Sequence, residues 1–287
     1  MKLTRKKYML FTLSFVGLFL LSGCTSPTDA SGNIIMIFKD TPFMTTINDT
    51  GWFGVFVWPI AQIINYSADY VGAAGGIMAA AVITNIVVVL LTIRSQIGMQ
   101  RIQLIQPELL KIQNKYEGKT DDQSKMRMAQ EMQALYGKYN INPLSSMLGT
   151  FVQFPIIFAI FQAVQRSPIV TNGTFLGMSL EQTPWNGITH GEWMYILLFV
   201  VMIAAQLGSM LVPQWLSKKK AKEKAAREHH RYVEQKNPMG NTMYFMMLPI
   251  IVLSVVWPSG MVVYFTISSL VNIVKTLVVQ YIVDRKG

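Results

Sequence analysis

Four long stretches without a charged residue constrain this chain more than any other feature. They are Tyr70–Ile93, Tyr139–Gln165, Trp193–Ser217 and Asn237–Val274, and each borders a cluster of Lys and Arg. A helix that crosses a bilayer needs about 20 mostly apolar residues, whereas a soluble helix carries charges along its solvent face. With 51% hydrophobic and 14% charged residues, the chain is predicted to be an all-α integral membrane protein.

The first 24 residues resemble a bacterial lipoprotein signal sequence. Four basic residues between positions 2 and 7 precede an apolar core at 8–21, and Leu21-Ser22-Gly23-Cys24 follows. This tetrapeptide resembles the lipobox, whose Cys is diacylated, with palmitate for example, and becomes the new N-terminus. We therefore expect residues 1–23 to be removed and Cys24, the only Cys, to carry lipid on the outer face. The alternative is an uncleaved signal anchor with an incidental Cys.

The distribution of basic residues predicts the orientation of the chain. Segments Arg94–Lys138 and Gln214–Lys236 carry eight Lys or Arg each, whereas Cys24–Asp69 and Arg166–Glu192 carry one each. Basic loops stay in the cytoplasm. The first two segments are therefore expected inside, and the other two outside.

The fourth uncharged stretch is too long for a single span. We expect Trp257-Pro258-Ser259-Gly260 to form an outer turn between helices near 241–256 and 260–282. The result is a core of five transmembrane helices at 71–283. The expected N-terminus lies outside the bacterial cell membrane and the C-terminus in the cytoplasm.

Three further segments complete the expected organisation. Residues 24–51 are predicted to be a polar, mobile linker, and residues 52–70 an aromatic-rich amphipathic helix in the outer headgroup layer. Residues 214–240 are predicted to be a basic cytoplasmic loop. In 94–140, apolar residues recur every three or four positions, which predicts a cytoplasmic helical hairpin; they are Ile102, Ile105, Leu109, Ile112 and Tyr116, then Met128, Met132, Leu135 and Tyr139. Two helices lying flat on the inner leaflet are the alternative.

Polar side chains inside the expected spans provide the candidate functional site. Such groups are costly in hydrocarbon and usually face a bundle interior or water. Each could instead make an isolated interhelical hydrogen bond worth roughly 0.6 kcal/mol. Because four of the five spans contribute amides or hydroxyls, we expect one shared polar cavity. The residues that we expect to line it, called the groove residues below, are Thr84, Asn85, Gln153, Gln206, Tyr264, Ser268 and Asn272.

Signals of an enzyme or a metal site are missing from the sequence. No carboxylate lies in any of the four uncharged stretches, and the patterns HExxH, GxSxG and the P-loop do not occur. The His residues are His190, in an expected outer loop, and the pair His229-His230 in a basic stretch. We therefore expect no enzymatic activity, no metal and no cofactor.

Several motifs resemble the YidC/Oxa/Alb family of membrane protein insertases, in its Gram-positive lipoprotein form. They are Trp52-Phe53-Gly54 with Trp58-Pro59, Gln106-Pro107-Glu108 with Lys115-Tyr116, Asn142-Pro143-Leu144 with Gln153-Phe154-Pro155-Ile156, Met246-Met247-Leu248-Pro249, and Pro258-Ser259-Gly260-Met261-Val262-Val263-Tyr264. The resemblance implies a five-span core with a hydrophilic groove. That groove would receive the polar part of a nascent membrane protein while the hydrophobic segment enters lipid.

The resemblance also implies partners, and it shows one departure. Nascent membrane proteins and the Sec translocon are expected partners, with no small-molecule substrate; the basic loops would contact the ribosome or anionic lipids. The family typically places an Arg in span one, where an ungapped count from Gln106-Pro107-Glu108 puts Asn85. We therefore expect a polar but neutral groove, and Asn85→Arg to shift preference toward acidic tails. The alternative functions are a non-inserting scaffold lipoprotein or degenerate paralogue, and a small-solute transporter.

Overall fold

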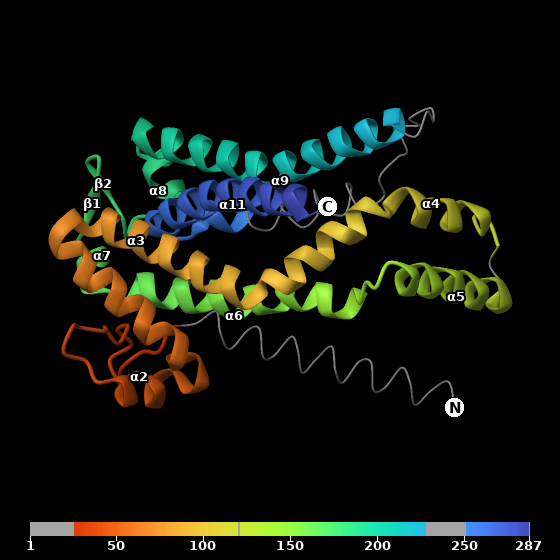
Figure 1. Ribbon diagram of the computed structural model, residues 1–287. Helices are drawn as coiled ribbons and strands as arrows, with labels where there is room; N and C mark the ends of the chain where they lie inside the picture. The colour runs from red at the N-terminus through yellow and green to blue at the C-terminus, as the bar shows by residue number, and fades with distance from the viewer. Residues whose placement is uncertain (1–25, 120, 228–250, 287) are drawn as a thin grey trace. The chain divides into compact units, whose positions relative to one another are not determined.

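The computed structural model describes residues 26–119, 121–227 and 251–286 (Figure 1). The expected signal sequence, Cys24 and most of the fourth expected span lie outside these residues. The described chain is mostly helical. Its strands β1 (Thr174–Phe175) and β2 (Met178–Ser179) form an antiparallel pair in which Phe175 faces Met178.

The chain divides into two compact units. Unit 1 contains Met1–Thr84, Gln153–Met202 and Val252–Ser268, as far as these are described, and unit 2 contains Asn85–Val152, Ile203–Ile251 and Ser269–Gly287. Several long helices pass from one unit into the other.

The helices follow one another along the chain as expected for an all-α membrane protein. In order they are α2 (Phe43–Thr50), the 3₁₀ turn η1 (Gly51–Phe53), α3 (Gly54–Leu104), α4 (Gln106–Lys115), α5 (Asp122–Lys138), α6 (Pro143–Arg166), α7 (Pro168–Thr171), α8 (Pro184–Thr189), α9 (Trp193–Arg227) and α11 (Ser259–Lys286). Residues 251–256 are also helical. Within the described residues, three helical stretches are long and apolar enough to cross a membrane: Phe43–Ile93, Trp193–Leu216 and Ser259–Tyr281.

A glycine divides α3 into two legs, 54–71 and 73–104. The backbone of Gly72 has φ 73° and ψ 173°, a conformation that is essentially restricted to Gly because a Cβ would clash. Gly72 lies two positions after residue 70, where the interfacial helix was expected to end. The second leg supplies the first apolar span.

The segment before α3 is folded, which differs from the mobile linker expected at 24–51. Ile37 and Thr46 are fully buried. The side-chain amide of Gln62 donates to Phe38 O (3.0 Å) and that of Asn65 to Ile37 O (2.8 Å). The side-chain amides of Gln62 and Asn65 thus satisfy the backbone carbonyls of residues 37 and 38, which have no regular secondary structure. The segment before α3 therefore covers the polar face of the first α3 leg.

The helix α9 continues to Arg227, although a loop was expected from residue 214. Residues 218–227 are Lys, Ala, Glu and Arg, which are strong helix formers, so the helix extends beyond its apolar part. The rest of the expected loop, 228–240, lies outside the described residues.

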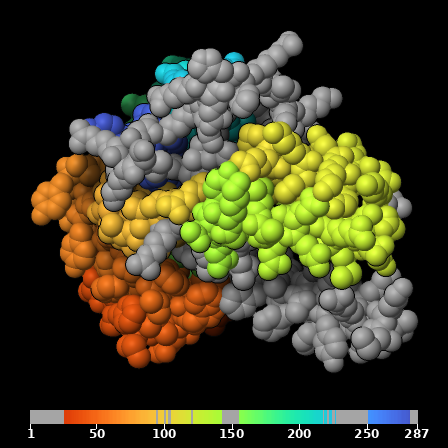
Figure 2. All heavy atoms as spheres, turned by 45° about the vertical axis from the view of Figure 1, so that its right-hand side comes forward, coloured from red at the N-terminus to blue at the C-terminus, as the bar shows by residue number. Residues whose placement is uncertain are grey.

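Helices α4 and α5 pack against each other in unit 2 (Figures 1 and 2). The chain leaves α3 at Ile105 because Pro107, near the start of α4, cannot donate the helical hydrogen bond. At the start of α5, the Asp121 carboxylate accepts from Ser124 N (2.7 Å) and caps the helix. An apolar cluster closes the base of the pair: Ile102, Ile105, Leu109 and Ile141, packed with Met132, Leu135, Tyr136 and Tyr139. The cytoplasmic location of the pair stays a prediction.

Candidate functional site

In unit 2, helices α9 and α11, which both carry groove residues, meet through a polar contact. The hydroxyl of Ser269 on α11 donates to the side-chain oxygen of Gln206 on α9, at 2.5 Å. The two helices therefore run side by side at this point (Figure 1). Ser209, one turn further along α9, donates to the Gln206 carbonyl (2.8 Å). A polar pair of this kind between apolar helices marks a shared, lipid-shielded face.

The polar face of α11 continues from Ser269 toward its C-terminal end. Asn272 and Thr276 follow at three and seven residues, so all three share one face of the helix. The Asn272 side-chain oxygen accepts from Lys275 Nζ (2.5 Å), and its carbonyl accepts from the Thr276 hydroxyl (2.9 Å). The opposite face is apolar and exposed, at Leu270, Val274, Leu277, Val278 and Tyr281. This half of α11 is therefore amphipathic within a hydrophobic span.

Three groove residues of unit 1 are buried, namely Thr84, Tyr264 and Ser268. Tyr264 and Ser268 lie one turn apart on α11. Thr84, near the middle of α3, is 9% exposed, and its hydroxyl has no hydrogen-bond partner among the described residues. Such a group is costly inside a bilayer unless it contacts water or another polar chain.

The structure thus brings the groove residues together only in part. In unit 2, Gln206 and Asn272 lie on the faces joined by Ser269, and Asn85 is half-buried on α3. In unit 1, Tyr264 and Ser268 are neighbours. Gln153 belongs to α6, but its side chain is outside the described set. A single groove lined by all seven residues stays a prediction, and so does lipidation at Cys24.

Sequence reasoning missed Lys275. This residue lies inside the expected span 260–282, but it is the first residue after the uncharged stretch Asn237–Val274. A search for uncharged windows excludes such a residue by construction. A search for charges inside expected helices would have found it.

Arg166 was also missed, because it was counted only as a loop charge. It ends α6 and is fully buried. Its Nε donates to Ile35 O (2.7 Å), one terminal nitrogen donates to the Thr50 hydroxyl (2.6 Å), and the other lies 3.4 Å from the Asp49 carboxylate. Its own carbonyl accepts from Ile37 N (2.7 Å). We call this set the Arg166 clamp: it fastens the segment before α3 to the end of α6.

Helices α4 and α5 are joined by a polar contact at the end away from the apolar cluster. The Glu131 carboxylate accepts from Lys115 Nζ (2.6 Å) and from the Tyr116 hydroxyl (2.8 Å). These two hydrogen bonds hold the pKa of Glu131 below its usual value and raise those of Lys115 and Tyr116. The tip of the pair is thus fixed by charge and its base by apolar packing.

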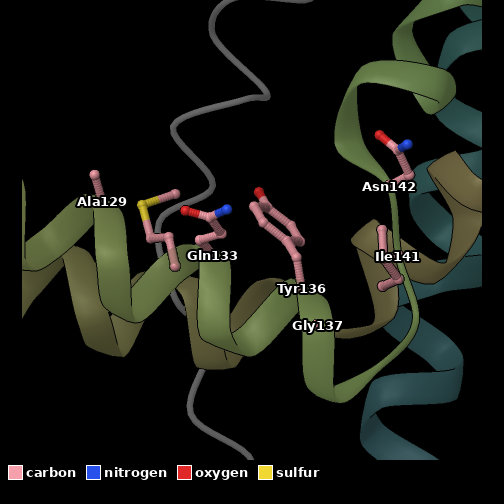
Figure 3. Close-up of a pocket in the computed structure, with 7 residues that line it drawn as sticks. Ala129, Gln133, Tyr136, Gly137, Ile141 and Asn142 are labelled. Atoms are coloured by element: carbon pink, nitrogen blue, oxygen red, sulfur yellow. The ribbon is translucent and has the colours of Figure 1, made fainter.

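An open hollow of about 690 Å³ lies beside the C-terminal half of α5 (Figure 3). Figure 3 shows the side chains of Ala129, Gln133 and Tyr136 on the same side of the helix, with Ile141 and Asn142 beyond its end. The remaining lining residues are Met132 and Gly137. In the described part of the chain, no cluster of three or more His, Cys, Asp or Glu residues could hold a metal ion.

These features define an all-α membrane protein whose apolar helices carry polar side chains toward one another. Residues 66–286 match the family described as "60Kd inner membrane protein". The chain therefore belongs to this family, the YidC/Oxa/Alb family that its motifs resemble, and the resemblance is confirmed.

Several similar proteins are named membrane protein insertases. The chain is 35% identical to "Membrane protein insertase YidC 1" of Streptococcus pyogenes serotype M1 over 63% of its length and 57% of that protein. It is 26% identical to "Membrane protein insertase MisCA" of Bacillus subtilis over 93% of its length and 89% of that protein. With the YidC insertase of Mycoplasmopsis pulmonis the identity is 26%, and the chain spans only 38% of that protein.

Proposed function

We propose that this chain is a membrane protein insertase and folding factor for nascent membrane proteins. The observation that carries the proposal is the hydrogen bond between Gln206 and Ser269, which gives two bilayer-length helices a common polar face. Kinship with proteins named insertases supports the same function.

The physical task fits this arrangement. The polar part of an incoming chain would lose hydrogen bonds in hydrocarbon, at a cost of several kcal/mol for each unsatisfied group. A polar face inside the membrane replaces these bonds while the apolar segment of the client moves into lipid. The proposed activity needs no covalent chemistry, nucleotide or cofactor, so the protein is not proposed to be an enzyme.

The proposed topology has five spans, with a lipidated Cys24 outside the cell membrane and the C-terminus in the cytoplasm. Helices α4 and α5 would then form a cytoplasmic hairpin, on the same side of the membrane as the basic part of α9. Their charges would contact anionic lipids or the ribosome, and the Sec translocon would be a further partner. The basic residues of α9 between 218 and 227 support an inner location, because such residues stay on the cytoplasmic side.

Reconstitution tests the proposed function directly. The purified protein is placed in liposomes, and a small single-span client is synthesised in their presence. Insertion is measured as protection of the client from an external protease. We expect insertion to depend on the protein and to fall when the polar pair is removed by Gln206→Leu together with Ser269→Ala.

The same liposomes separate the alternative functions. Flux of small solutes without client insertion would support a transporter, and absence of both activities would support a scaffold. The matched control for the double variant is Leu211→Ala, because Leu211 is an exposed apolar residue on the same helix. Insertion should be unchanged in this control.

A further inference from the structure

The described part of the chain begins in contact with the end of α6. The hydroxyl of Ser26, the first described residue, donates to the side-chain oxygen of Gln165 at 2.6 Å. Two residues later the backbone turns back on itself, and Thr28 pairs with Ile34 in an antiparallel bridge. The chain just after the expected lipidation site is therefore held against α6, rather than joined to it by a mobile linker.

A polar hollow of about 650 Å³ lies beside this contact, within unit 1. Three segments line it: the start of the described chain with Thr28 and Ile34, the end of α2 with Asp49 and Thr50, and the last turns of α6 with Gln162 and Gln165. Its hydroxyl and amide groups are hydrogen-bond donors. The Asp49 carboxylate lies 3.4 Å from the buried Arg166 guanidinium, so the two charges balance. The hollow therefore suits a ligand that is polar but uncharged.

Cys24 is within reach of this hollow. Two residues of extended chain span at most about 7 Å, so the Cα atom of Cys24 lies no further than that from the Cα atom of Ser26. Ser26 itself lines the hollow. A diacylated Cys carries a glyceryl group whose two ester groups join the fatty acids. These esters are uncharged and accept hydrogen bonds, which matches the chemistry of the lining.

The position of the hollow along α6 also fits a lipid ester. The second uncharged stretch ends at Gln165, and the hollow lies at this end of the helix. An expected span reaches the headgroup layer there. In a bilayer, the ester groups of lipids lie at the same level, between the hydrocarbon core and the headgroups. A fatty acid that starts from the hollow can therefore enter the hydrocarbon directly.

We propose that this hollow is the binding site for the glyceryl diester of the lipid on Cys24. The ester oxygens accept hydrogen bonds from the groups that line it, among them Thr28 and Gln165. Ser26 is a positioning residue, because its bond to α6 holds Cys24 beside the hollow. The inference rests on the lipidation of Cys24 proposed above. It makes the lipid a structural part of unit 1, next to the Arg166 clamp, rather than a freely moving anchor.

Enzymatic release of the fatty acids tests this site. The full-length protein is produced in a Gram-positive host and purified in detergent, and a lipase that cleaves acyl esters is added. Mass spectrometry of the N-terminal peptide follows the loss of acyl groups. We expect release from the folded protein to be about tenfold slower than from the same lipidated peptide cut free by a protease. The esters must leave the hollow before the lipase can bind them.

Two variants show whether the hollow provides this protection. Thr28→Trp places a large side chain in the hollow, and acyl release should then be nearly as fast as from the free peptide. Ser26→Ala removes the bond to Gln165 and should speed release about fivefold.

Ser31→Trp is the matched control, because Ser31 is exposed in the same turn and does not line the hollow. It should release acyl groups as slowly as the unchanged protein. Equal thermal unfolding of Thr28→Trp and Ser31→Trp shows that the fold is intact. If Thr28→Trp unfolds at a lower temperature, the smaller change Ser26→Ala decides the test.

Four results would overturn the assignment. Equal release from the folded protein and from the free peptide would mean that the lipid is not bound. Equal acceleration by Ser31→Trp and Thr28→Trp would mean a general loosening of the turn. If Thr28→Trp lost a co-purified phospholipid without faster acyl release, a free lipid would be the ligand. A peptide without acyl groups would refute the lipidation itself. None of these readings depends on client insertion, which the liposome assay measures separately.

Discussion

Arg166 has the largest fully buried side chain among the described residues. A guanidinium group is stable in such a place only when its donors are satisfied, and the Arg166 clamp supplies a carbonyl, a hydroxyl and a carboxylate. These acceptors come from the segment at 35–50, far away in sequence. One residue therefore connects two parts of unit 1 that the sequence presents as unrelated.

We expect Arg166→Met to lower the free energy of unfolding by about 3–5 kcal/mol, because Asp49 is left without its buried partner. Thermal unfolding in detergent measures the change. The control is Lys39→Ala, which removes the exposed pair with Asp69 and should cost at most about 1 kcal/mol. Equal losses in the two variants would contradict the structural role of the clamp.

Gly72 determines local structure through its backbone rather than its side chain. Because φ 73° and ψ 173° exclude a Cβ, Gly72→Ala should destabilise the protein by about 1–3 kcal/mol. Gly137→Ala is the matched control, since Gly137 is helical and has open space around it. That change should be neutral or slightly stabilising. The prediction fails if both variants unfold at the same temperature.

At the scale of elements, the sequence was most informative where periodicity operates. Among the described residues, the uncharged stretches indicated three helices that are long and apolar enough to cross a membrane. The spacing of Ile102, Ile105 and Leu109 indicated an apolar helix face that the structure places in the cluster at the base of α4 and α5. The folded segment before α2 gave no such signal. Its stability depends on single long-range contacts with Gln62 and Asn65, which no local pattern encodes.

The candidate site shows the same division. Polar residues on apolar helices could be recognised from the sequence, because each is exceptional in its own surroundings. Their pairing could not, since the contact of Gln206 with Ser269 depends on the rotation of two helices about their axes. Lys275 required a further step, because only the direction of its side chain distinguishes an inward charge from one that extends to the headgroups.

The tip of the α4–α5 pair should loosen in acid. The pKa of Glu131 is lowered in the folded state, so its contribution is present above the unfolded value of about 4.3 and is lost as pH falls through the lowered pKa. Spin labels at Lys111→Cys and Ala134→Cys measure the distance between the helices. We expect the distance distribution to broaden from about pH 6 to about pH 3.

The control for this experiment is Glu131→Gln, which cannot ionise. Its distribution should already be broad at about pH 6 and should change little on acidification. A Glu131→Gln protein with the same pH response as the unchanged protein would assign the effect to other carboxylates.

At the scale of the whole molecule, the property to be tested is the orientation of the chain in the membrane. Met44 on α2 and Met126 on α5 are both 64% exposed, so Met44→Cys and Met126→Cys offer equally accessible thiols. In intact cells, a thiol reagent that cannot cross the membrane should label only position 44, because basic segments stay inside. After permeabilisation, both positions should react.

Labelling of position 126 in intact cells would reverse the proposed topology. Labelling of both positions would show that the chain adopts two orientations. Cys24 is expected to be blocked by its lipid, and a protein without either new Cys shows the background.

The Arg166 clamp also sets an order of events during synthesis. Arg166 follows its acceptors at Ile35 and Thr50 by 131 and 116 residues. At about 5–20 residues per second, these acceptors are made roughly 6–26 s before their donor. For that time the early segment lacks the group that fastens it, and Ile37 has no finished surface to cover it. The segment at 35–50 can therefore reach its final structure only after Arg166 has been made.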